Sequence, residues 1–192
     1  MVTAQLEHEL MQSVSGEVRF DAYSRAMYST DASIYQIEPL GVVLPRNKED
    51  VIATVDLAHR YGVPILPRGG GTSLAGQTVG RAIVMDMSKY MNNVLEVNTE
   101  EQWARVQPGI VLEQLNHQIR DTGLFFAPDP ATANRSNVGG AIGNNSCGSH
   151  SILYGKTIDQ IKELETVLSD GYLAQLAPLR RSSWRPSSMA MV

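Results

Sequence analysis

The feature that most constrains this chain is a glycine-rich stretch that directly follows a short apolar run. The apolar run covers residues 63–66, and the stretch reads PRGGGTSLAGQ over residues 67–77. The apolar run predicts a buried strand that Pro67 closes. Three successive glycines lack a Cβ, so the backbone can take positive φ and approach a ligand closely. Because successive N–H groups in such a turn attract anions, the stretch predicts a diphosphate site.

The side chains around the glycines suit the same ligand. Thr72 and Ser73 supply hydroxyl donors, and Arg68 supplies a permanent positive charge that we expect at the rim of the turn. Two common phosphate motifs fail on spacing. A P-loop needs a Lys after its last glycine, where this chain has Gln77. A Rossmann fingerprint fails because Leu74 or Ser73 stands where it needs a glycine.

A second glycine-rich segment lies far downstream and reads NRSNVGGAIGNNSCG over residues 134–148. PDPAT precedes it at 128–132, and HSILYGKTIDQI follows it at 150–161. Two anion-binding loops so far apart in the sequence suit a long ligand that lies across the domain. The pair of loops therefore predicts a dinucleotide.

Five segments together resemble one known family. PRGGGTSLAGQ, QPGIVLEQLN, FAPDPAT, NVGGAIGNNSCGSHSILYGKT and ETVLSDG occur in this order. In order and spacing the chain is similar to the PCMH-type FAD-binding domain of the vanillyl-alcohol oxidase / p-cresol methylhydroxylase flavoproteins. Within that family it most resembles FAD-linked oxidases related to D-lactate dehydrogenase, glycolate oxidase and D-2-hydroxyglutarate dehydrogenase. The resemblance runs from about Tyr35 to Asp170.

The resemblance implies an α+β fold with a small βαβ lobe and a larger antiparallel-sheet lobe with helices. We expect an N-terminal lead-in at 1–34 on the periphery, and a FAD-binding domain at 35–176 that is incomplete at its C-terminal end. Residues 177–192 read APLRRSSWRPSSMAMV and have no periodicity. In the family a further helix, strands and a substrate domain follow, so the tail predicts a truncated or frameshifted reading frame. The alternative is a natural short module with its own tail.

Periodicity and caps predict the individual elements. In the small lobe, a helix that Asn47 caps and Gly62 ends connects parallel strands at 40–44 and 63–66, and a third strand lies at 82–85. The elements expected in the second lobe are antiparallel strands at 95–97 and 104–106, a helix at 112–119 that Gly123 closes, and a hairpin at 164–168 and 172–176.

The resemblance also implies which residues bind FAD. The first loop would wrap the pyrophosphate, chiefly through backbone N–H groups, with Arg68, Gly69, Gly70, Gly71, Thr72, Ser73, Leu74 and Gln77. A turn close to the flavin would contain Pro108 and Gly109, and the flavin pocket would include Asp129 and Pro130. The second cradle comprises Ser136, Gly139, Gly140, Gly143, Asn145, Ser146 and Gly148, and Tyr154 packs on the cofactor.

Some of these residues have two open interpretations. Gln77 faces the isoalloxazine side or is a solvated loop residue. Asp129 lines the flavin pocket or caps the loop that follows it. His150 lies near the cofactor or is an ordinary polar loop residue.

The attachment of FAD is expected to be non-covalent. Many relatives bind flavin through a His directly after the first glycines, and this chain has Gly71 at that position. The single cysteine, Cys147, does not match the family's cysteine attachment position and is expected to serve as a small packing residue.

Composition excludes several classes of partner. The net charge is −4 with both signs interspersed, so a nucleic-acid partner is not expected. The sequence contains no apolar run of 18 residues and so no membrane span. The N-terminus has no signal-peptide pattern, and the expected location is cytoplasmic.

The sequence therefore predicts the FAD-binding domain of a flavin-dependent oxidoreductase that acts on a D-2-hydroxy acid. The alternative is a truncated, catalytically inactive nucleotide-binding fragment. No catalytic or metal-binding residue is predicted, because in the family those residues lie on the later domain. A hydroxy acid is expected to bind only if that domain is supplied, and the isolated chain is expected to be inactive.

Overall fold

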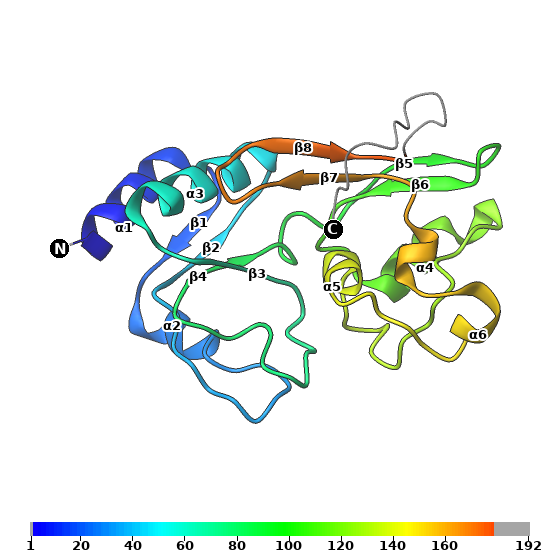
Figure 1. Cartoon of the computed structure of the whole chain (residues 1–192), viewed down its shortest axis with the longest axis horizontal. Helices are drawn as coiled ribbons and strands as arrows, with labels where there is room; N and C mark the ends of the chain where they lie inside the picture. Colours follow the sequence, from blue (N-terminus) through cyan, green and yellow to red (C-terminus); the bar gives the residue numbers. More distant parts are fainter. Residues whose placement is uncertain (1, 179–192) are drawn as a thin grey trace, which may run out of the picture.

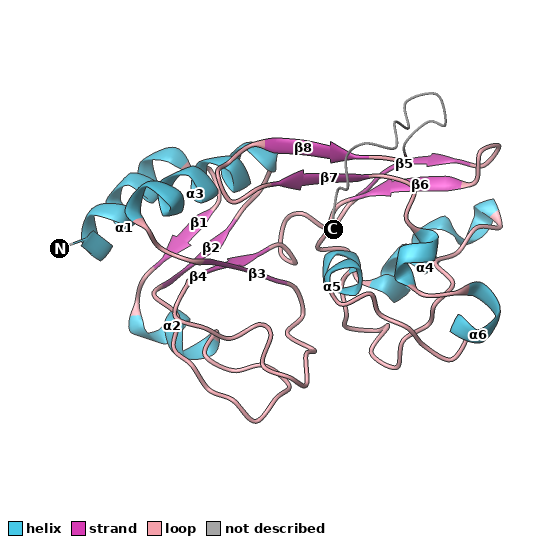
Figure 2. Ribbon diagram, in the orientation of Figure 1, coloured by secondary structure: helices cyan, strands magenta, loops and turns pink. Residues whose placement is uncertain are grey.

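The computed structural model describes residues 2–178, which fold into two lobes joined across a long hairpin (Figures 1 and 2). The first lobe is built on a four-stranded sheet of order β1-β2-β4-β3. Its strands are β1 (Glu17–Arg19), β2 (Gly41–Leu44), β3 (Ile65–Arg68) and β4 (Ile83–Asp86). Its helices are α1 (Val2–Ser13), α2 (Ala22–Met27) and α3 (Lys48–Tyr61).

The sheet contains the predicted parallel strands and one that the sequence analysis missed. β2 and β3 run parallel but do not pair, because β4 lies between them and pairs in parallel with both. The short strand β1 adds antiparallel to β2. β3 also runs through Pro67 instead of ending there. A proline is tolerated at this position because β3 is an edge strand.

Helix α3 begins and ends at the predicted residues. Asn47 Oδ1 accepts a hydrogen bond from the backbone N–H of Asp50 at 2.8 Å. Gly62 takes the left-handed conformation, φ 63°, after the last turn. The two caps satisfy backbone groups that the helix itself leaves unpaired, which explains why a pattern in the sequence located both ends.

The N-terminal region is part of the core, so the expectation that it lies on the periphery is wrong. Leu6 and Leu10 of α1 are 1% and 0% exposed, and they pack in one cluster with Val43 and Ile83 of the sheet and Leu57 of α3. Figure 1 shows α1 and α3 together over one face of the sheet. A second cluster, which includes Val42, Leu44 and Val84, covers the other face. The sheet is therefore buried on both faces.

The second lobe contains the predicted antiparallel strands and helices. Its elements are β5 (Val94–Asn98), β6 (Trp103–Val106), α4 (Leu112–Ile119), η1 (Arg120–Thr122), α5 (Val138–Gly143), α6 (Ser151–Tyr154), η2 (Thr157–Gln160), β7 (Leu164–Val167) and β8 (Leu173–Leu176). The strands form two separate antiparallel pairs, β5–β6 and β7–β8. The predicted helix ends at Gly123, φ 75°, after the extra turn η1. Of the expected tail, residues 179–192 lie outside the described residues.

The hairpin β7–β8 connects the two lobes. It extends over the top of the first lobe toward β5 and β6 (Figure 1). Lys48 at the start of α3 forms an ion pair with Glu165 of β7, with 3.3 Å between Nζ and Oε1. Within residues 2–178, no helix combines the length and the apolar character needed to cross a membrane.

Substitution of Leu10 tests the role of α1 in the core. We expect Leu10→Ala to lower the free energy of unfolding by about 2–5 kcal/mol, because it removes a fully buried side chain. The neighbouring Met11 is 56% exposed, so Met11→Ala is the control. This control should change the free energy of unfolding by less than about 0.5 kcal/mol. Urea denaturation followed by circular dichroism measures both. Equal effects would contradict a core role for α1.

The carboxylate of Glu17 predicts a pH dependence. It accepts hydrogen bonds from Lys89, Tyr90 and Arg19, which lower its pKa from 4.5 to about 2. A carboxylate with a depressed folded-state pKa stabilises the fold above pH 4.5, and this contribution is lost as the pH falls toward 2. We expect Glu17→Gln to lower the melting temperature at pH 7, with a difference from wild type that shrinks below pH 4.5. A difference independent of pH would contradict this.

Candidate functional site

The first glycine-rich loop follows β3 and presents a row of free backbone donors. The N–H groups of Gly71, Thr72, Ser73 and Leu74 form no hydrogen bond with any residue of the described chain. Of the glycine triplet, Gly71 alone has positive φ, 63°, and it is buried. Adjacent amides without partners are a binding site for an anion. The loop therefore has the donors that a diphosphate needs.

The guanidinium of Arg68 is not a free charge at the rim, which corrects the sequence-based expectation. It donates hydrogen bonds to the backbone carbonyls of Tyr28, Thr30 and Thr78 at 3.3, 2.8 and 3.0 Å. It also lies 5.3 Å from the centre of the Tyr28 ring. A Cβ built on Gly71 would be 2.7 Å from Arg68 Nη2, so the charge still lies next to the loop. Arg68 thus ties the N-terminal segment to the loop.

The side chains of Ser73 and Gln77 in the first loop bind each other, and Gln77 also binds the second loop. Ser73 Oγ donates to Gln77 Oε1 and accepts from the N–H groups of Ala75 and Gln77 at 3.2 and 3.3 Å. Gln77 Nε2 donates to Asn144 Oδ1 at 2.8 Å. Gln77 is therefore a link between the loops and not simply a solvated residue, and its place beside the isoalloxazine stays a prediction.

The second loop contains glycines of two kinds. A Cβ on Gly139 would lie 2.9 Å from Pro108 Cβ, and a Cβ on Gly148 would lie 1.9 Å from the Asp129 carbonyl oxygen. In the turn before α4, a Cβ on Gly109 would lie 2.0 Å from the Met87 carbonyl oxygen. These three glycines are required by backbone packing. Pro108 is part of the same packing, because its carbonyl accepts the N–H of Gly139 at 2.8 Å.

Gly140 and Gly143 have no such neighbours. A Cβ on either would find no heavy atom within 4 Å, and neither has positive φ. Both lie in helix α5, where each glycine costs about 1 kcal/mol relative to alanine. They lie three residues apart, so they share one face of the helix. Nothing in the described fold requires these two glycines, which suits the close approach of a ligand to that face.

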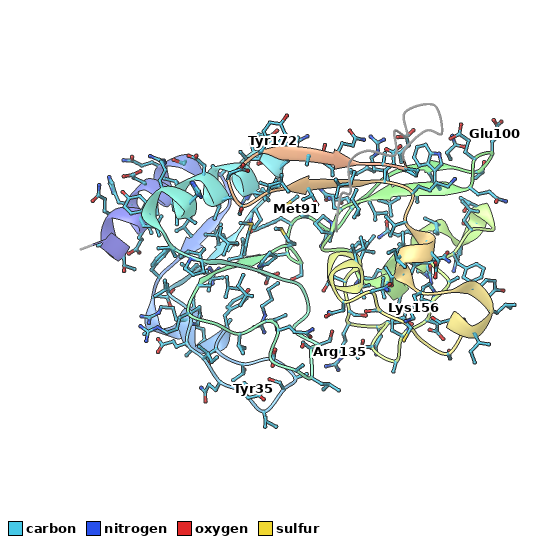
Figure 3. All side chains as sticks on the ribbon, viewed as in Figure 1. Tyr35, Met91, Glu100, Arg135, Lys156 and Tyr172 are labelled. Atoms are coloured by element: carbon cyan, nitrogen blue, oxygen red, sulfur yellow. The ribbon has the colours of Figure 1, made fainter. Side chains whose placement is uncertain are left out.

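The two loops meet at the boundary between the lobes, where Figure 3 labels Arg135 and Met91. A Cβ on Gly70 would lie 2.4 Å from the carbonyl oxygen of Arg135. The N–H of Gly70 donates to Asn137 Oδ1 at 2.5 Å, and Asn137 Nδ2 donates to the Gly109 carbonyl at 2.5 Å. The sequence analysis missed both Asn137 and Asn144. An asparagine directly before a short helix reads as an N-cap, so no local pattern indicated a bond between lobes.

Asp129 is held by the second loop and does not cap the residues that follow it. Its Oδ2 accepts from Ser149 Oγ at 2.8 Å and lies 3.8 Å from His150 Nδ1. Its φ of 49° is unusual for a residue other than glycine. Pro130 turns the chain by accepting the N–H of Ala133 at 2.8 Å. A role of Asp129 in a flavin pocket stays a prediction.

Other predicted residues lie along the second loop. Ser136 Oγ donates to the Thr132 carbonyl at 2.9 Å. Asn145, φ 45°, accepts the N–H of Ile158 at 3.0 Å, and the Ser146 carbonyl accepts from Thr157 Oγ1 at 2.8 Å. These bonds fix the shape of the loop.

An aromatic group closes the second loop. The Tyr154 ring makes an edge-to-face contact with Phe125, with 5.6 Å between the ring centres, and lies 6.4 Å from the His150 ring. The Tyr154 side chain remains available at the surface, since the residue is 43% exposed. Cys147 is exposed, so its predicted role as a packing residue is wrong.

A cavity of about 1470 Å³ lies beneath the hairpin β7–β8. Its walls include Val55, Met85, Leu115, Phe126 and Val167. Of the predicted cofactor-binding residues, Pro108 alone lines it. The walls also carry charged side chains, among them Lys48, Glu101 and Arg105. Because the cavity contains a single one of the predicted cofactor-binding residues, the two loops remain the candidate site. Between residues 2 and 178, no three His, Cys, Asp or Glu side chains converge as metal ligands would.

Comparison with protein families matches residues 39–177 to the FAD binding domain. This chain belongs to the FAD binding domain family. The FAD binding domain is 44% identical over 167 residues to a D-2-hydroxyglutarate dehydrogenase of Pseudomonas putida, and the match covers 85% of this chain and 17% of that relative. It is 37% identical over 177 residues to the glycolate oxidase subunit GlcD of Bacillus subtilis, covering 89% of this chain and 37% of that protein.

Solved structures confirm the predicted fold class of the FAD binding domain. An alkyldihydroxyacetonephosphate synthase matches with a TM-score of 0.81 and 28% identity, over 92% of this chain and 35% of that one. A p-cresol methylhydroxylase matches with a TM-score of 0.74 and 17% identity, over 91% of this chain and 35% of that one. The predicted family and the α+β, PCMH-type fold are therefore confirmed.

Substitution of Gly70 tests whether the loops must approach each other this closely. The added Cβ of Gly70→Ala would overlap the Arg135 carbonyl oxygen, so we expect a loss of about 1–3 kcal/mol in the free energy of unfolding. A Cβ on Gly80 meets Leu66 Cδ2 at an ordinary 3.6 Å, so Gly80→Ala is the matched control. Denaturant titration compares them. Equal stability of both variants would show that the lobes do not meet at Gly70.

Proposed function

We propose that this chain binds FAD non-covalently between its two glycine-rich loops, as the cofactor domain of a flavin-dependent oxidoreductase acting on a D-2-hydroxy acid. Membership of the FAD binding domain family supports the cofactor. The names of relatives support the substrate class, because D-2-hydroxyglutarate, glycolate and D-lactate are all 2-hydroxy acids.

Two features together support this binding mode: the free backbone donors of the first loop and the open glycine face of α5. The amides of residues 71–74 lack partners among the described residues, and a Cβ on Gly140 or Gly143 of α5 would meet no heavy atom within 4 Å. A diphosphate bound there would satisfy the amides and would explain why α5 contains glycines where alanine would be more stable.

The chain's own residues would bind and orient the cofactor. FAD, when bound, supplies the group that accepts a hydride from the substrate. The amides of the first loop would hold its diphosphate, and Tyr154 with Phe125 would offer an apolar surface beside the second loop. With Gly71 at the position of the family's attachment histidine, we propose that the flavin is dissociable.

A second candidate function is cofactor binding without turnover. The chain spans 17% of the length of the D-2-hydroxyglutarate dehydrogenases it matches, and we assign no residue between 2 and 178 to the substrate carboxylate or to proton removal. Turnover requires the substrate carbon to be held close to the flavin. The described residues support binding of the cofactor better than they support catalysis.

The test is a titration of the purified chain with FAD, FMN and NAD. We expect FAD to bind with the highest affinity and to raise the melting temperature by mass action. Denaturation should release the flavin from the polypeptide. Preference for NAD, or flavin that stays with the denatured chain, would contradict the proposal.

A substitution at Gly140 tests the binding mode. Gly140→Leu places a good helix former in open space, so the apo protein should be at least as stable as wild type, while FAD affinity should fall by at least about tenfold. Gln114→Leu, on the exposed side of α4, controls for an added surface leucine and should bind FAD as wild type does. Unchanged affinity in Gly140→Leu would exclude this face as the cofactor site.

A further inference from the structure

We propose that Asn137 is a positioning residue that fixes the two cofactor loops relative to each other, an inference that rests on the proposed function. Asn137 is 3% exposed. Its Oδ1 accepts the N–H of Gly70 from the first loop, and its Nδ2 donates to the carbonyl of Gly109. One buried amide therefore holds backbone groups of two segments that lie far apart in the sequence.

The side chain of Asn137 is not used for the role that its position suggests. It is the N-cap residue of α5, where an asparagine commonly accepts an N–H from the first turn of its own helix. Its side chain makes no such capping bond here. It bonds instead to Gly70 and Gly109, so the local stabilisation of α5 is given up for a contact between segments.

The contact determines where the row of free amides begins. The N–H of Gly70 is bonded to Asn137, whereas the amides of residues 71–74 donate to no described residue. Asn137 Oδ1 also packs against the glycines themselves, because a Cβ on Gly69 would lie 2.5 Å from it. Asn137 thus anchors the first loop to α5, whose open glycine face lies directly after it in the sequence.

Removal of this side chain should affect ligand binding more than folding. Without the amide, the bond of Gln77 to Asn144 still links the two loops, but the bond that holds Gly70 at the start of α5 is lost. A cofactor that needs both loops would then bind to a site that is in the correct geometry only part of the time, which lowers its apparent affinity.

The first experiment needs neither FAD nor a variant. Amide hydrogen exchange of the wild-type chain without ligand should show Gly70 protected, whereas the amides of Gly71 and Thr72 exchange much faster. Exchange of Gly70 as fast as its two neighbours would overturn the inference.

The second experiment compares FAD affinity in Asn137→Ser and Asn116→Ser. Serine is as good an N-cap as asparagine, so the start of α5 is retained, but its shorter side chain does not reach both the Gly70 N–H and the Gly109 carbonyl. Asn116 is the matched control, since it bridges the N–H and the carbonyl of Phe126 at 2.7 and 3.2 Å within one lobe. We expect similar losses of melting temperature in both variants, but a dissociation constant for FAD raised about tenfold in Asn137→Ser alone.

The outcomes separate this inference from the proposed function. If wild type binds FAD and both variants bind it equally well, Asn137 is only structural and the inference is overturned, while the proposed function stands. If wild type does not bind FAD, the proposed function fails and the inference fails with it. If Asn137→Ser does not fold, the exchange of Gly70 in the wild-type chain decides.

Discussion

The close approach of backbone to backbone between the lobes is the constraint on which the rest of the structure depends. A Cβ would lie 2.4 Å from the Arg135 carbonyl oxygen at Gly70 and 2.0 Å from the Met87 carbonyl oxygen at Gly109, so no other residue fits without moving the chain. Asn137 joins these two crossing points through one buried amide. Since protein interiors are close-packed, a displacement at one crossing would be transmitted to the next. The geometry of both loops follows from these contacts.

The glycines of this domain serve several physical purposes. Some allow chains to cross, Gly62 and Gly123 end helices in the left-handed conformation, and Gly140 and Gly143 face open space within α5. Glycine in a helix is unfavourable because it loses more backbone entropy on folding than alanine. The two glycines in α5 and the free amides of residues 71–74 are the observations that support the anion site proposed above.

The N-terminal region shows how tertiary contacts change the role of a residue. The sequence predicts a positive charge of Arg68 at the rim of the loop, and in the structure its guanidinium also binds the carbonyls of Tyr28 and Thr30. A planar group with five donors readily satisfies several carbonyls at once. With α1 in the core and β1 in the sheet, these contacts make the first 30 residues part of the scaffold under the loop.

The sequence by itself determined the family, the fold class, the two loops and most of the elements. Caps, turns and periodicity are local, which is why Asn47, Gly62 and Gly123 marked the ends of their helices correctly. Tertiary structure alone decided the insertion of β4 between β2 and β3, the burial of α1 and the partners of Arg68, Gln77 and Asn137. These features depend on residues far apart in the sequence, 40 positions in the bond of Arg68 to Tyr28 and 67 positions in the bond of Gly70 to Asn137. Local patterns carry no information about such pairs.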